Sequence, residues 1–376
     1  MKLIRLSASR YRCLREVSFS LGELNVFIGP NASGKSSILD ALRFLQEGVQ
    51  QRDFQHAVRS RLGILALAWM GDEHHRVSLA VELSEREHRY EWSVILDRGG
   101  NDFTTSEAVF ELHGGSARKQ LLESNRGEGW WLSGENRRVP LAQSSTACAL
   151  SAAAADASFP ARKIADFVDG WGFFDPNPFL LHGGWAAPRS SRLDSYGRNL
   201  AERLDELSKS SPEVFEQIVS STQSILGFPM RIKPVEVAGG QFFLLHQEWG
   251  IPIGVLQSAV SSGTLRILAL MSALFGEEPS SLVGIEEPEN NIHPTALAAF
   301  AQHLLKARQR VQILITTHSP LLLDYLNDPS AVCVVHRSEQ EGTKVIREED
   351  PERIRTALME SGFGLGELYE TTGFGG

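Results

Sequence analysis

Residues 29–36 have the residue types and the spacing that bind the phosphate chain of a nucleotide. The segment reads GPNASGKS and matches G-x-x-x-x-G-K-[ST], directly after an apolar strand and directly before an amphipathic helix. The glycines let backbone N–H groups point at the β-phosphate, where the helix dipole adds partial positive charge. We expect Lys35 to reach the β- and γ-phosphates and Ser36 to ligate Mg²⁺. The expected nucleotide contacts are Gly29, Asn31, Ala32, Ser33, Gly34, Lys35, Ser36 and Ser37.

An acidic pair closes a second apolar segment, residues 282–287, which reads LVGIEE. Side chains alternate along a strand, so the two carboxylates are expected to point to different sides. One can hold the Mg²⁺ shell while the other polarises a water aimed at the γ-phosphate. We assign Glu286 to the metal and Glu287 to the water. Most P-loop proteins have Asp at the first position, so Glu286 could bind Mg²⁺ through a water.

A histidine follows a third apolar segment, residues 311–315, in the sequence TTHSP. A single histidine at a strand end is often an ordinary surface residue. His318 lies after the acidic pair in a strand of the same predicted sheet, where a γ-phosphate sensor is expected. The predicted catalytic residues are therefore Lys35, Glu287 and His318.

The elements that must position these residues alternate between short apolar strands and helices. Strands are expected at 24–28, 281–285, 311–315 and 332–335, and helices after residue 36 and at 264–275 and 294–308. This order predicts a parallel sheet covered on both faces. Residues 76–112 alternate as antiparallel strands, and residues 241–256 are interpreted as a hairpin. Residues 114–190, rich in Gly, Ser and Ala, are interpreted as a small helical subdomain, with two further helices beginning near Leu200 and Pro212.

The composition is that of a globular protein. The 376 residues are 42% hydrophobic and 22% charged, and no run approaches 18 apolar residues. The N-terminus has no apolar signal-peptide core, and three widely spaced cysteines suit a reducing compartment, so a cytoplasmic location is expected. The net charge of −9 argues against a surface built for non-specific nucleic-acid binding, although a local basic face remains open. The densest basic group is Lys2, Arg5, Arg10, Arg12 and Arg15.

The order of these motifs resembles the SMC/RecF-like branch of ABC ATPases, including stand-alone RecF-like ATPases and the ATPase halves of OLD-type nucleases. The opening LSASRYRCLREVSFSLGELNVFIGPNASGKSSILDAL is similar to the first hairpin and Walker A motif of that family. Residues 260–266, VSSGTLR, resemble its signature loop, and GIEEPENNIHP resembles its Walker B motif and D-loop. TTHSP is similar to its switch histidine, and GRNL at 197–200 to its entry into the second lobe.

The resemblance implies a mechanism in which ATP joins two heads. Ser261 and the backbone N–H of Gly263 would contact, in trans, the γ-phosphate held by Lys35 of the partner subunit. The implied cofactors are ATP and Mg²⁺, and the implied assembly is an ATP-dependent homodimer. A plain helix cap is the alternative interpretation of Ser-Ser-Gly. DNA, or a separate nuclease or effector protein, is a further candidate partner, and no membrane partner is expected.

The fold class expected from the resemblance is α/β: an ABC-type P-loop head with a mixed or parallel sheet, an antiparallel β subdomain and an inserted helical lobe. The expected boundaries are 1–112 for the N-terminal lobe, 113–240 for a mainly helical insert, and 241–376 for the C-terminal lobe. The chain departs from the family at Val260, Ser262 and Asn291. The family's Mg²⁺-contacting glutamine cannot be placed with one candidate; those available are Gln46, Gln50, Gln51 and Gln55. We favour Gln55, and no long coiled coil is expected.

Other functions remain open at this stage. The chain could be the nucleotide-binding subunit of a transporter, a nucleotide-binding scaffold with little turnover, or a small-molecule kinase that shares only the phosphate loop. Residues 72–75, DEHH, have metal-binding residue types without ligand spacing and are interpreted as a solvated turn. The segment after residue 335 is too short for the Toprim nuclease domain of OLD-type proteins, so nuclease activity is not expected.

Overall fold

The computed structural model describes residues 1–69, 76–99, 102–113, 117–183, 192–237, 241–248, 250, 253–276, 280–347 and 350–372. The chain divides into two compact units, and each is built from segments that are distant in sequence. Unit 1 consists of Met1–Gly22, Gly29–Trp171 and Cys333–Arg347. Unit 2 consists of Glu23–Ile28, Gly172–Val332 and Glu348–Gly376. The Walker A segment therefore belongs to unit 1, whereas the acidic pair, the switch histidine and the signature loop belong to unit 2.

Unit 1 is built on an antiparallel sheet with the strand order β2-β1-β4-β5-β6-β7-β8-β9. Its strands are β1 (Lys2–Tyr11), β2 (Leu14–Ser20), β4 (Val77–Glu85), β5 (His88–Gly99), β6 (Asp102–Leu112), β7 (Arg118–Asn125), β8 (Glu128–Leu132) and β9 (Arg138–Ala142). Along β4 and β5 every second residue is buried, so one face of the sheet supplies the core. The antiparallel strands expected at 76–112 are confirmed.

The expected boundary at residue 113 is wrong, because β7, β8 and β9 continue the same sheet to Ala142. These strands are short, and glycine and serine interrupt their alternation, so composition alone favoured a helical region. Gly129 in β8 shows the constraint, since a Cβ there would lie 2.0 Å from the carbonyl oxygen of Glu123 on β7. After residue 113, the first helices are α4 (Ala149–Ala154) and α5 (Lys163–Asp169).

The helix after the phosphate loop belongs to unit 1 and packs in its core. The helix α1 (Lys35–Gln51) buries Ile38, Leu42 and Leu45 on one side, as their spacing predicts. Two short helices, α2 (Gln55–Arg59) and α3 (Ile64–Leu67), follow it. The strands β16 (Val332–Ser338) and β17 (Gly342–Arg347) form an antiparallel pair in which Val335 lies opposite Val345. The strand expected at 332–335 is therefore longer than its apolar core.

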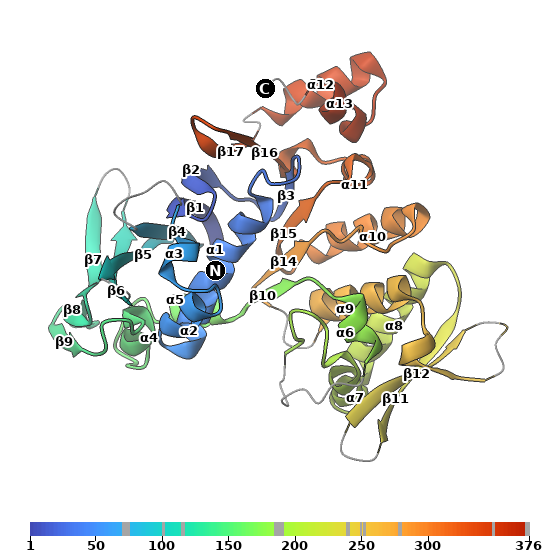
Figure 1. Cartoon of the computed structure of the whole chain (residues 1–376), viewed down its shortest axis with the longest axis horizontal. Helices are drawn as coiled ribbons and strands as arrows, with labels where there is room; N and C mark the ends of the chain where they lie inside the picture. The colour runs from blue at the N-terminus through green and yellow to red at the C-terminus, as the bar shows by residue number, and fades with distance from the viewer. Residues whose placement is uncertain are drawn as a thin grey trace. The chain divides into compact units, whose positions relative to one another are not determined.

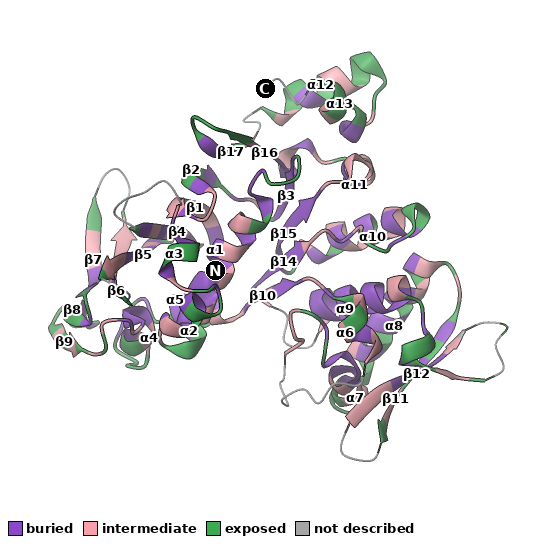
Figure 2. Ribbon diagram, in the orientation of Figure 1, coloured by how far each residue is buried: buried purple, intermediate pink, exposed green. Residues whose placement is uncertain are grey.

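Unit 2 contains the parallel strands that the sequence predicts. The strand β15 (Gln312–Thr317) pairs in parallel with β14 (Leu282–Glu286) and with β3 (Leu24–Ile28), and it lies between them in Figure 1. A fourth strand, β10 (Trp171–Phe174), lies beside β14. All residues of β3 and β15 are buried, as Figure 2 shows in purple. Strands buried on both faces have continuous apolar runs, which explains why these segments were recognisable.

The carboxyl ends of the three parallel strands meet at one edge, because Glu286 pairs with Thr316 and Thr317 pairs with Ile28. The helix α10 (Pro294–Ala307) connects β14 to β15, and α9 (Ser262–Phe275) precedes β14. The helix α9 begins two residues before the expected position, and the ends of β14 and β15 differ from the expected ones by one or two residues. These differences lie at the ends of elements, where a capping residue or a turn decides the last residue. The spacing of apolar residues does not show that position.

The remainder of unit 2 consists of helices and a small sheet of order β11-β12-β13. Its strands are β11 (Met230–Val237), β12 (Gln241–Glu248) and β13 (Val255–Leu256). The hairpin expected at 241–256 is confirmed, because β12 pairs antiparallel with β13. The strand β11, which was not expected, pairs antiparallel with the other side of β12. The other elements are α6 (Pro178–His182), α7 (Leu200–Ser210), α8 (Pro212–Leu226), η1 (Gln257–Ala259), α11 (Pro320–Leu326), η2 (Pro329–Ala331), α12 (Pro351–Ser361) and α13 (Leu365–Thr372).

Candidate functional site

The phosphate loop of unit 1 begins at Gly29, the residue after the last residue of β3. Lys35 is the first residue of α1 and is 5% exposed, and its Nζ donates to the carbonyl oxygens of Gly29 (2.8 Å) and Pro30 (3.0 Å). Ala32 and Gly34 have φ angles of 61° and 114°, in the left-handed region. Such turns aim consecutive backbone N–H groups into a concave surface, which is the geometry of an anion-binding loop.

Two glycines of the loop touch the β16–β17 pair of the same unit. A Cβ on Gly29 would lie 2.1 Å from the carbonyl oxygen of Val335, and one on Gly34 would lie 2.6 Å from Thr343 Oγ1. The Thr343 hydroxyl donates to the carbonyl oxygen of Ser33 (2.8 Å). The glycines are therefore required by packing as well as by backbone conformation. The sequence had no signal for Thr343, which is more than 300 residues away from the loop.

Among the described residues, the loop offers hydrogen-bonding groups without partners, as a phosphate-binding site must. The first turn of α1 presents backbone N–H groups without intrahelical acceptors and has no acidic side chain. Ser33 is 1% exposed, and within the described ranges its Oγ has no hydrogen-bond partner. Buried hydroxyls are rarely left without a partner, so this oxygen is suited to a ligand atom. Asn31, Ala32 and Ser36 are exposed at the rim.

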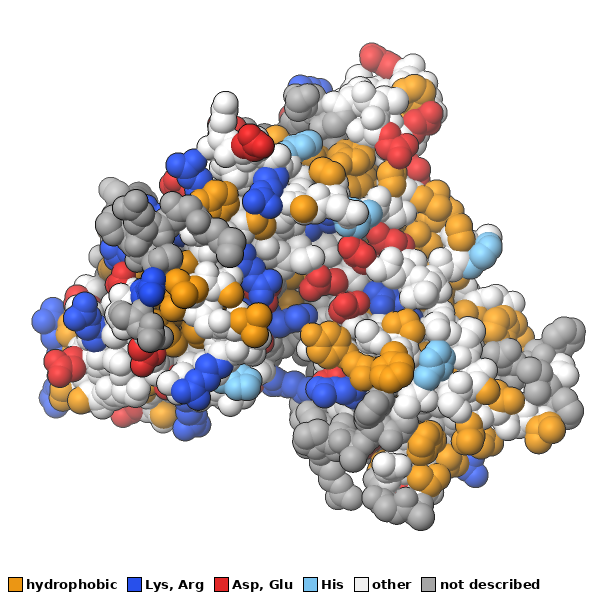
Figure 3. Space-filling model, in the orientation of Figure 1, with side chains coloured by type: hydrophobic (Ala, Val, Ile, Leu, Met, Phe, Trp, Pro, Cys, Tyr) orange, Lys and Arg blue, Asp and Glu red, His pale blue; other side chains and the backbone are white. Residues whose placement is uncertain are grey.

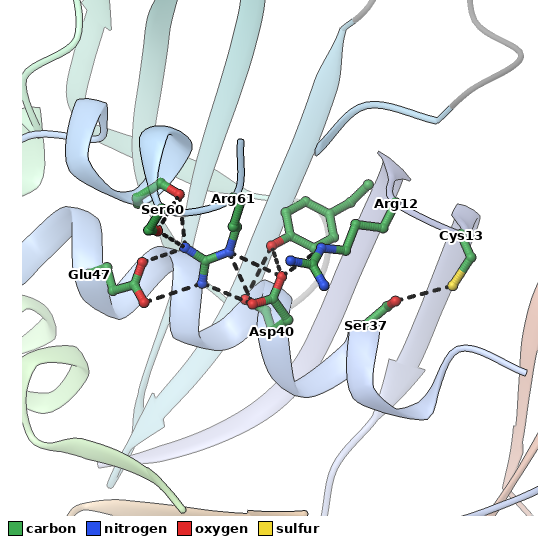
Figure 4. A network of polar contacts seen from close by, with 9 residues as sticks. Arg12, Cys13, Ser37, Asp40, Glu47, Ser60 and Arg61 are labelled. Carbon is green, nitrogen blue, oxygen red and sulfur yellow. Dashed lines mark hydrogen bonds and ion pairs between the residues drawn. The ribbon is translucent and has the colours of Figure 1, made fainter. Parts of the chain in front are cut away.

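A polar network fixes the helix that carries the loop to the sheet of unit 1 (Figure 4). Arg61 donates through Nε to Asp40 on α1 (3.0 Å) and through its Nη atoms to Glu47, about two turns further along the same face of the helix. Arg12 Nε lies 2.9 Å from Asp40, and the Tyr11 hydroxyl also donates to this carboxylate. Burial raises the pKa of Tyr11 well above its usual value. Arg12 therefore anchors the helix, and the basic group at the N-terminus is in part structural.

Within the same network the Cys13 thiol donates to Ser37 Oγ (3.2 Å), as Figure 4 shows. Ser37 is one of the predicted nucleotide contacts and lies in the first turn of α1. Its hydroxyl is therefore already oriented by β1–β2 residues before any ligand is considered.

The acidic pair of unit 2 lies at the carboxyl end of β14. Glu287 has a φ of 43°, which is strained for a residue with a side chain, and its N–H donates to the carbonyl oxygen of Thr316 (2.9 Å). Arg266, on α9 and 2% exposed, donates through Nη2 to the carbonyl oxygens of Glu286 (3.0 Å) and Glu287 (2.9 Å). Asp175 accepts from the same guanidinium (3.3 Å). A buried arginine therefore holds the backbone turn that separates the two carboxylates.

The structure brings Glu287 and His318 together. His318 Nε2 lies 3.1 Å from Glu287 Oε1, and both side chains are about one-third exposed. Asn290 Nδ2 donates to the second carboxylate oxygen of Glu287 (2.8 Å). This carboxylate is thus oriented from two sides and remains open to water, as a group that polarises an attacking water must be. Asn290 was not recognised from the sequence, although it lies only three residues after Glu287.

The signature loop is an exposed helix N-terminus. Ser261 is the N-cap of α9, and its Oγ accepts from the backbone N–H of Thr264 (3.1 Å). The Ser261 hydroxyl also lies 2.7 Å from Thr264 Oγ1, so this side chain caps the helix as the plain-cap interpretation predicts. Its contact with a γ-phosphate of a partner subunit stays a prediction. Asn291 has a φ of 62° in the left-handed region, where glycine or asparagine is favoured. The departure from the family's glycine at this position is therefore conformationally conservative.

The glutamine candidates lie in unit 1 and differ in their surroundings. Gln46 Nε2 donates to the carbonyl oxygen of Trp171, and Gln50 Nε2 donates to that of Asp169 (3.1 Å). Gln55 begins α2, and its backbone N–H donates to Asp53 Oδ1 (2.6 Å). Nothing in this geometry assigns one of them to Mg²⁺, and Gln55 stays a prediction.

Two further features concern metal and membrane. Within the described ranges, no group of three or more His, Cys, Asp and Glu side chains is arranged to hold a metal ion by itself. Glu286 and Ser36 would therefore need phosphate or water oxygens to complete a Mg²⁺ shell, as is usual for this ion.

The DEHH segment at 72–75 lies outside the described residues. No helix among the described residues has the length and apolarity to cross a membrane.

Comparisons with known proteins identify a family and a fold. Residues 24–324 match the family described as AAA domain, putative AbiEii toxin, Type IV TA system. No curated protein matches the chain. The fold is similar to an SMC head solved in complex with the C-winged helix domain of ScpA, with a TM-score of 0.58 and 12% identity over 92% of this chain and 98% of that one.

A second solved structure is the Smc head domain with an extended coiled coil bound to the C-terminal domain of ScpA, derived from Pyrococcus furiosus. It has a TM-score of 0.52 and 10% identity over 96% of this chain and 99% of that one. The predicted α/β fold of an ABC-type P-loop head is thereby confirmed. The chain belongs to the family described as AAA domain, putative AbiEii toxin, Type IV TA system, and its fold is that of SMC-type heads.

Proposed function

We propose that the chain binds and hydrolyses ATP, and that two copies close head-to-head around the nucleotide. The observation that carries this proposal is the Glu287–His318 contact of 3.1 Å at the carboxyl edge of the parallel strands. The strand β3 ends at the same edge, and the chain passes from it directly into the phosphate loop. A nucleotide-binding loop and an oriented carboxylate–imidazole pair are the parts that phosphoryl transfer to water requires.

Each residue has a distinct role in this proposal. The backbone N–H groups of residues 29–37 and Lys35 bind the phosphate chain, and Ser36 and Glu286 hold Mg²⁺ directly or through water. Glu287 orients and polarises the attacking water, and His318 holds this carboxylate and contacts the γ-phosphate. When bound, Mg²⁺ supplies positive charge that neutralises the phosphate oxygens.

Dimerisation is supported by the surface around the signature loop. Ser261 and Gly263 lie at the N-terminus of a 14-residue helix whose dipole favours an anion. Beside it, α6 packs on α9 and carries Phe179, which is 72% exposed. Figure 3 shows hydrophobic side chains gathered over this part of unit 2. An anion-binding helix end bordered by exposed apolar surface is suited to a second copy that presents its own bound ATP.

The decisive experiment compares the wild-type protein with Glu287→Gln. We expect the substitution to reduce ATP turnover by at least about 100-fold, because the amide cannot polarise water as a carboxylate does. We also expect it to accumulate an ATP-bound dimer, measured as mass in solution with and without ATP and Mg²⁺. Glu360→Gln on the exposed surface of α12 is the matched control and should leave both measurements unchanged. A wild-type protein that neither binds nor hydrolyses ATP would contradict the proposal.

We propose that the ATP cycle acts on a partner molecule, and that the process is DNA maintenance or defence against phage. The family description names a putative toxin of a type IV toxin–antitoxin system, and the similar SMC heads were solved with ScpA domains. Both are consistent with a head whose ATP cycle acts on another molecule. ATPase activity measured with and without double-stranded DNA tests the first role. Stimulation by DNA supports it, whereas an unchanged rate favours a protein effector, and very low turnover with stable ATP binding favours a scaffold.

A further inference from the structure

Glu289 connects the acidic turn to the end of the switch strand. One oxygen of its carboxylate, Oε1, accepts a hydrogen bond from the Thr317 hydroxyl (2.6 Å) and another from the backbone N–H of His318 (2.9 Å). Both donors lie 28 or 29 residues further along the chain, at the carboxyl end of β15. Neither this carboxylate nor Thr317 belongs to the catalytic groups proposed for ATP hydrolysis.

His318 is held at two points by the same short turn. Its ring contacts Glu287, and its backbone N–H donates to Glu289. The turn itself is closed by backbone bonds from Asn290 N to the Glu287 carbonyl oxygen and from Ile292 N to the Glu289 carbonyl oxygen (3.1 Å each). The two anchors therefore belong to one rigid segment, and the position of one limits the position of the other.

The hydroxyl of Thr317 extends the connection toward α11. It donates to Glu289 and accepts from the backbone N–H of Ser319 (2.9 Å). The residues on both sides of His318 are thus tied, directly or through one hydroxyl, to a single carboxylate oxygen. Two hydrogen bonds that converge on one oxygen restrict the positions of both donors, so this side chain can define the path of the loop.

The other oxygen of Glu289 indicates that fold stability alone does not explain the residue. Glu289 Oε2 is buried, and within the described part of the chain it has no hydrogen-bond partner. A buried polar atom without a partner destabilises a protein, and natural structures retain few of them. A residue kept despite this cost is a candidate for a role in the reaction.

We propose that Glu289 is a positioning residue, which sets the imidazole of His318 against Glu287 by fixing the backbone of the switch loop. This inference rests on the proposed ATPase function and adds a residue to the same site. Glu289 acts through His318 and does not itself contact the nucleotide. A displacement of about 1 Å at a catalytic group can reduce a rate by about 100-fold, which is the scale of the effect available to such a residue.

The test uses two substitutions at Glu289, one that removes the acceptor oxygen and one that keeps it. Glu289→Ala removes the oxygen that receives both bonds, whereas Glu289→Gln retains a carbonyl oxygen at the same place. We expect Glu289→Ala to lower kcat for ATP by at least about 10-fold while KM for ATP stays within about 2-fold, because the phosphate loop is untouched. Glu289→Gln should recover kcat to within about 3-fold of the wild type. Glu360→Ala on α12 is the matched control and should change neither parameter.

A second measurement does not depend on turnover. Amide hydrogen exchange of residues 312–320 reports the bond from His318 N–H, which should exchange at least about 10-fold faster in Glu289→Ala and at the wild-type rate in Glu289→Gln. If Glu289→Ala does not fold, Thr317→Val and Thr317→Ser replace the pair, because serine keeps the hydroxyl and valine does not. The same expectations for kcat and KM then apply, with Thr317→Ser as the conservative variant, and faster exchange is expected at the N–H of Ser319, which loses its acceptor in Thr317→Val.

The outcomes separate this inference from the proposed function. If Glu287→Gln stops hydrolysis while Glu289→Ala keeps the wild-type kcat, the positioning role is overturned and the ATPase stands. A decrease in kcat that Glu289→Gln does not recover also overturns it. If the wild-type protein hydrolyses no ATP, the ATPase proposal fails, and exchange at His318 decides alone. Equal exchange in the wild type and Glu289→Ala then overturns the structural role of Glu289.

Discussion

A Cβ atom on Gly263 would lie 2.5 Å from the carbonyl oxygen of Asn291. The first turn of α9 therefore packs directly on the backbone of the segment that follows the acidic pair. Real Cβ atoms do not approach a carbonyl oxygen so closely, and a backbone oxygen cannot move aside as a flexible side chain does. The glycine of the signature loop is required by this contact within one subunit, whether or not a second subunit also uses it.

This contact predicts the effect of Gly263→Ala on stability. We expect the alanine to lower the free energy of unfolding by about 1–3 kcal/mol, the usual range for forcing an atom into a packed site. Urea denaturation followed by circular dichroism would measure it. Gly99→Ala is the control, because a Cβ there would meet no atom within 4 Å and φ is not positive. Equal stabilities for the two variants would contradict the packing argument.

At Asn291, unlike at Gly263, glycine and the wild-type residue should be almost equally stable, whereas alanine should be less stable. Because its φ of 62° is in the left-handed region, Asn291→Gly should change the free energy of unfolding by less than about 0.5 kcal/mol. Asn291→Ala should cost about 1 kcal/mol, since a side chain that cannot bond to the local backbone is strained there. The difference in denaturation midpoint between the two variants is the measurement. A more stable alanine variant would refute the assignment of strain.

Ser261 permits a separation of its two suggested roles. Ser261→Ala removes the cap and should cost about 1 kcal/mol of stability. Ser261→Asp retains an acceptor for Thr264 N–H and places a negative charge at a helix N-terminus, so it should be as stable as the wild type. The same charge would repel a γ-phosphate brought by the second subunit.

We therefore expect Ser261→Asp to bind ATP normally but to remain monomeric when combined with Glu287→Gln in ATP. Light scattering of the double variant, compared with Glu287→Gln alone, is the measurement. An ATP-dependent dimer of the double variant would show that Ser261 acts only as a cap.

Glu107 predicts a pH dependence of stability in unit 1. Burial raises the pKa of Glu107 to about 7, although the N–H groups of Ala149 and Leu150 and the indole of Trp92 donate to it and oppose the increase. A carboxyl with a raised pKa contributes stability at pH values below its unfolded pKa and loses that contribution as the pH rises toward the folded pKa. The stabilisation is therefore complete below pH 4.5 and is lost by about pH 7.

The pKa difference of about 2.5 corresponds to about 3 kcal/mol between these limits. We expect the wild type to lose about this much stability relative to Glu107→Gln as pH rises from 5 to 8, because the amide does not titrate. Thermal or urea unfolding of both proteins across this range provides the comparison. A constant difference between the two at every pH would show that Glu107 does not titrate in this range.

The sequence was sufficient for features that depend on residues close together in the chain. The phosphate loop, the acidic pair at the end of β14 and the histidine at the end of β15 could all be predicted, because each motif is short and adjoins an apolar strand. The parallel strands could also be predicted, since burial on both faces requires uninterrupted apolar residues. The role of Asn290 could have been suspected from its place in the same turn as Glu287.

Only the tertiary structure decided which distant residues hold the phosphate loop of unit 1 and which hold the acidic turn of unit 2. Thr343 donates a hydrogen bond to the phosphate loop, and Arg266 donates to the carbonyl oxygens of the acidic pair. The carboxylate of Glu289 accepts a hydrogen bond from the N–H of His318. The strands β7–β9 joined the sheet of unit 1 for the same kind of reason, since pairing with neighbours outweighed their weak local pattern. Local sequence determines backbone conformation within a few residues, whereas a hydrogen bond between segments far apart exists only after packing brings them together.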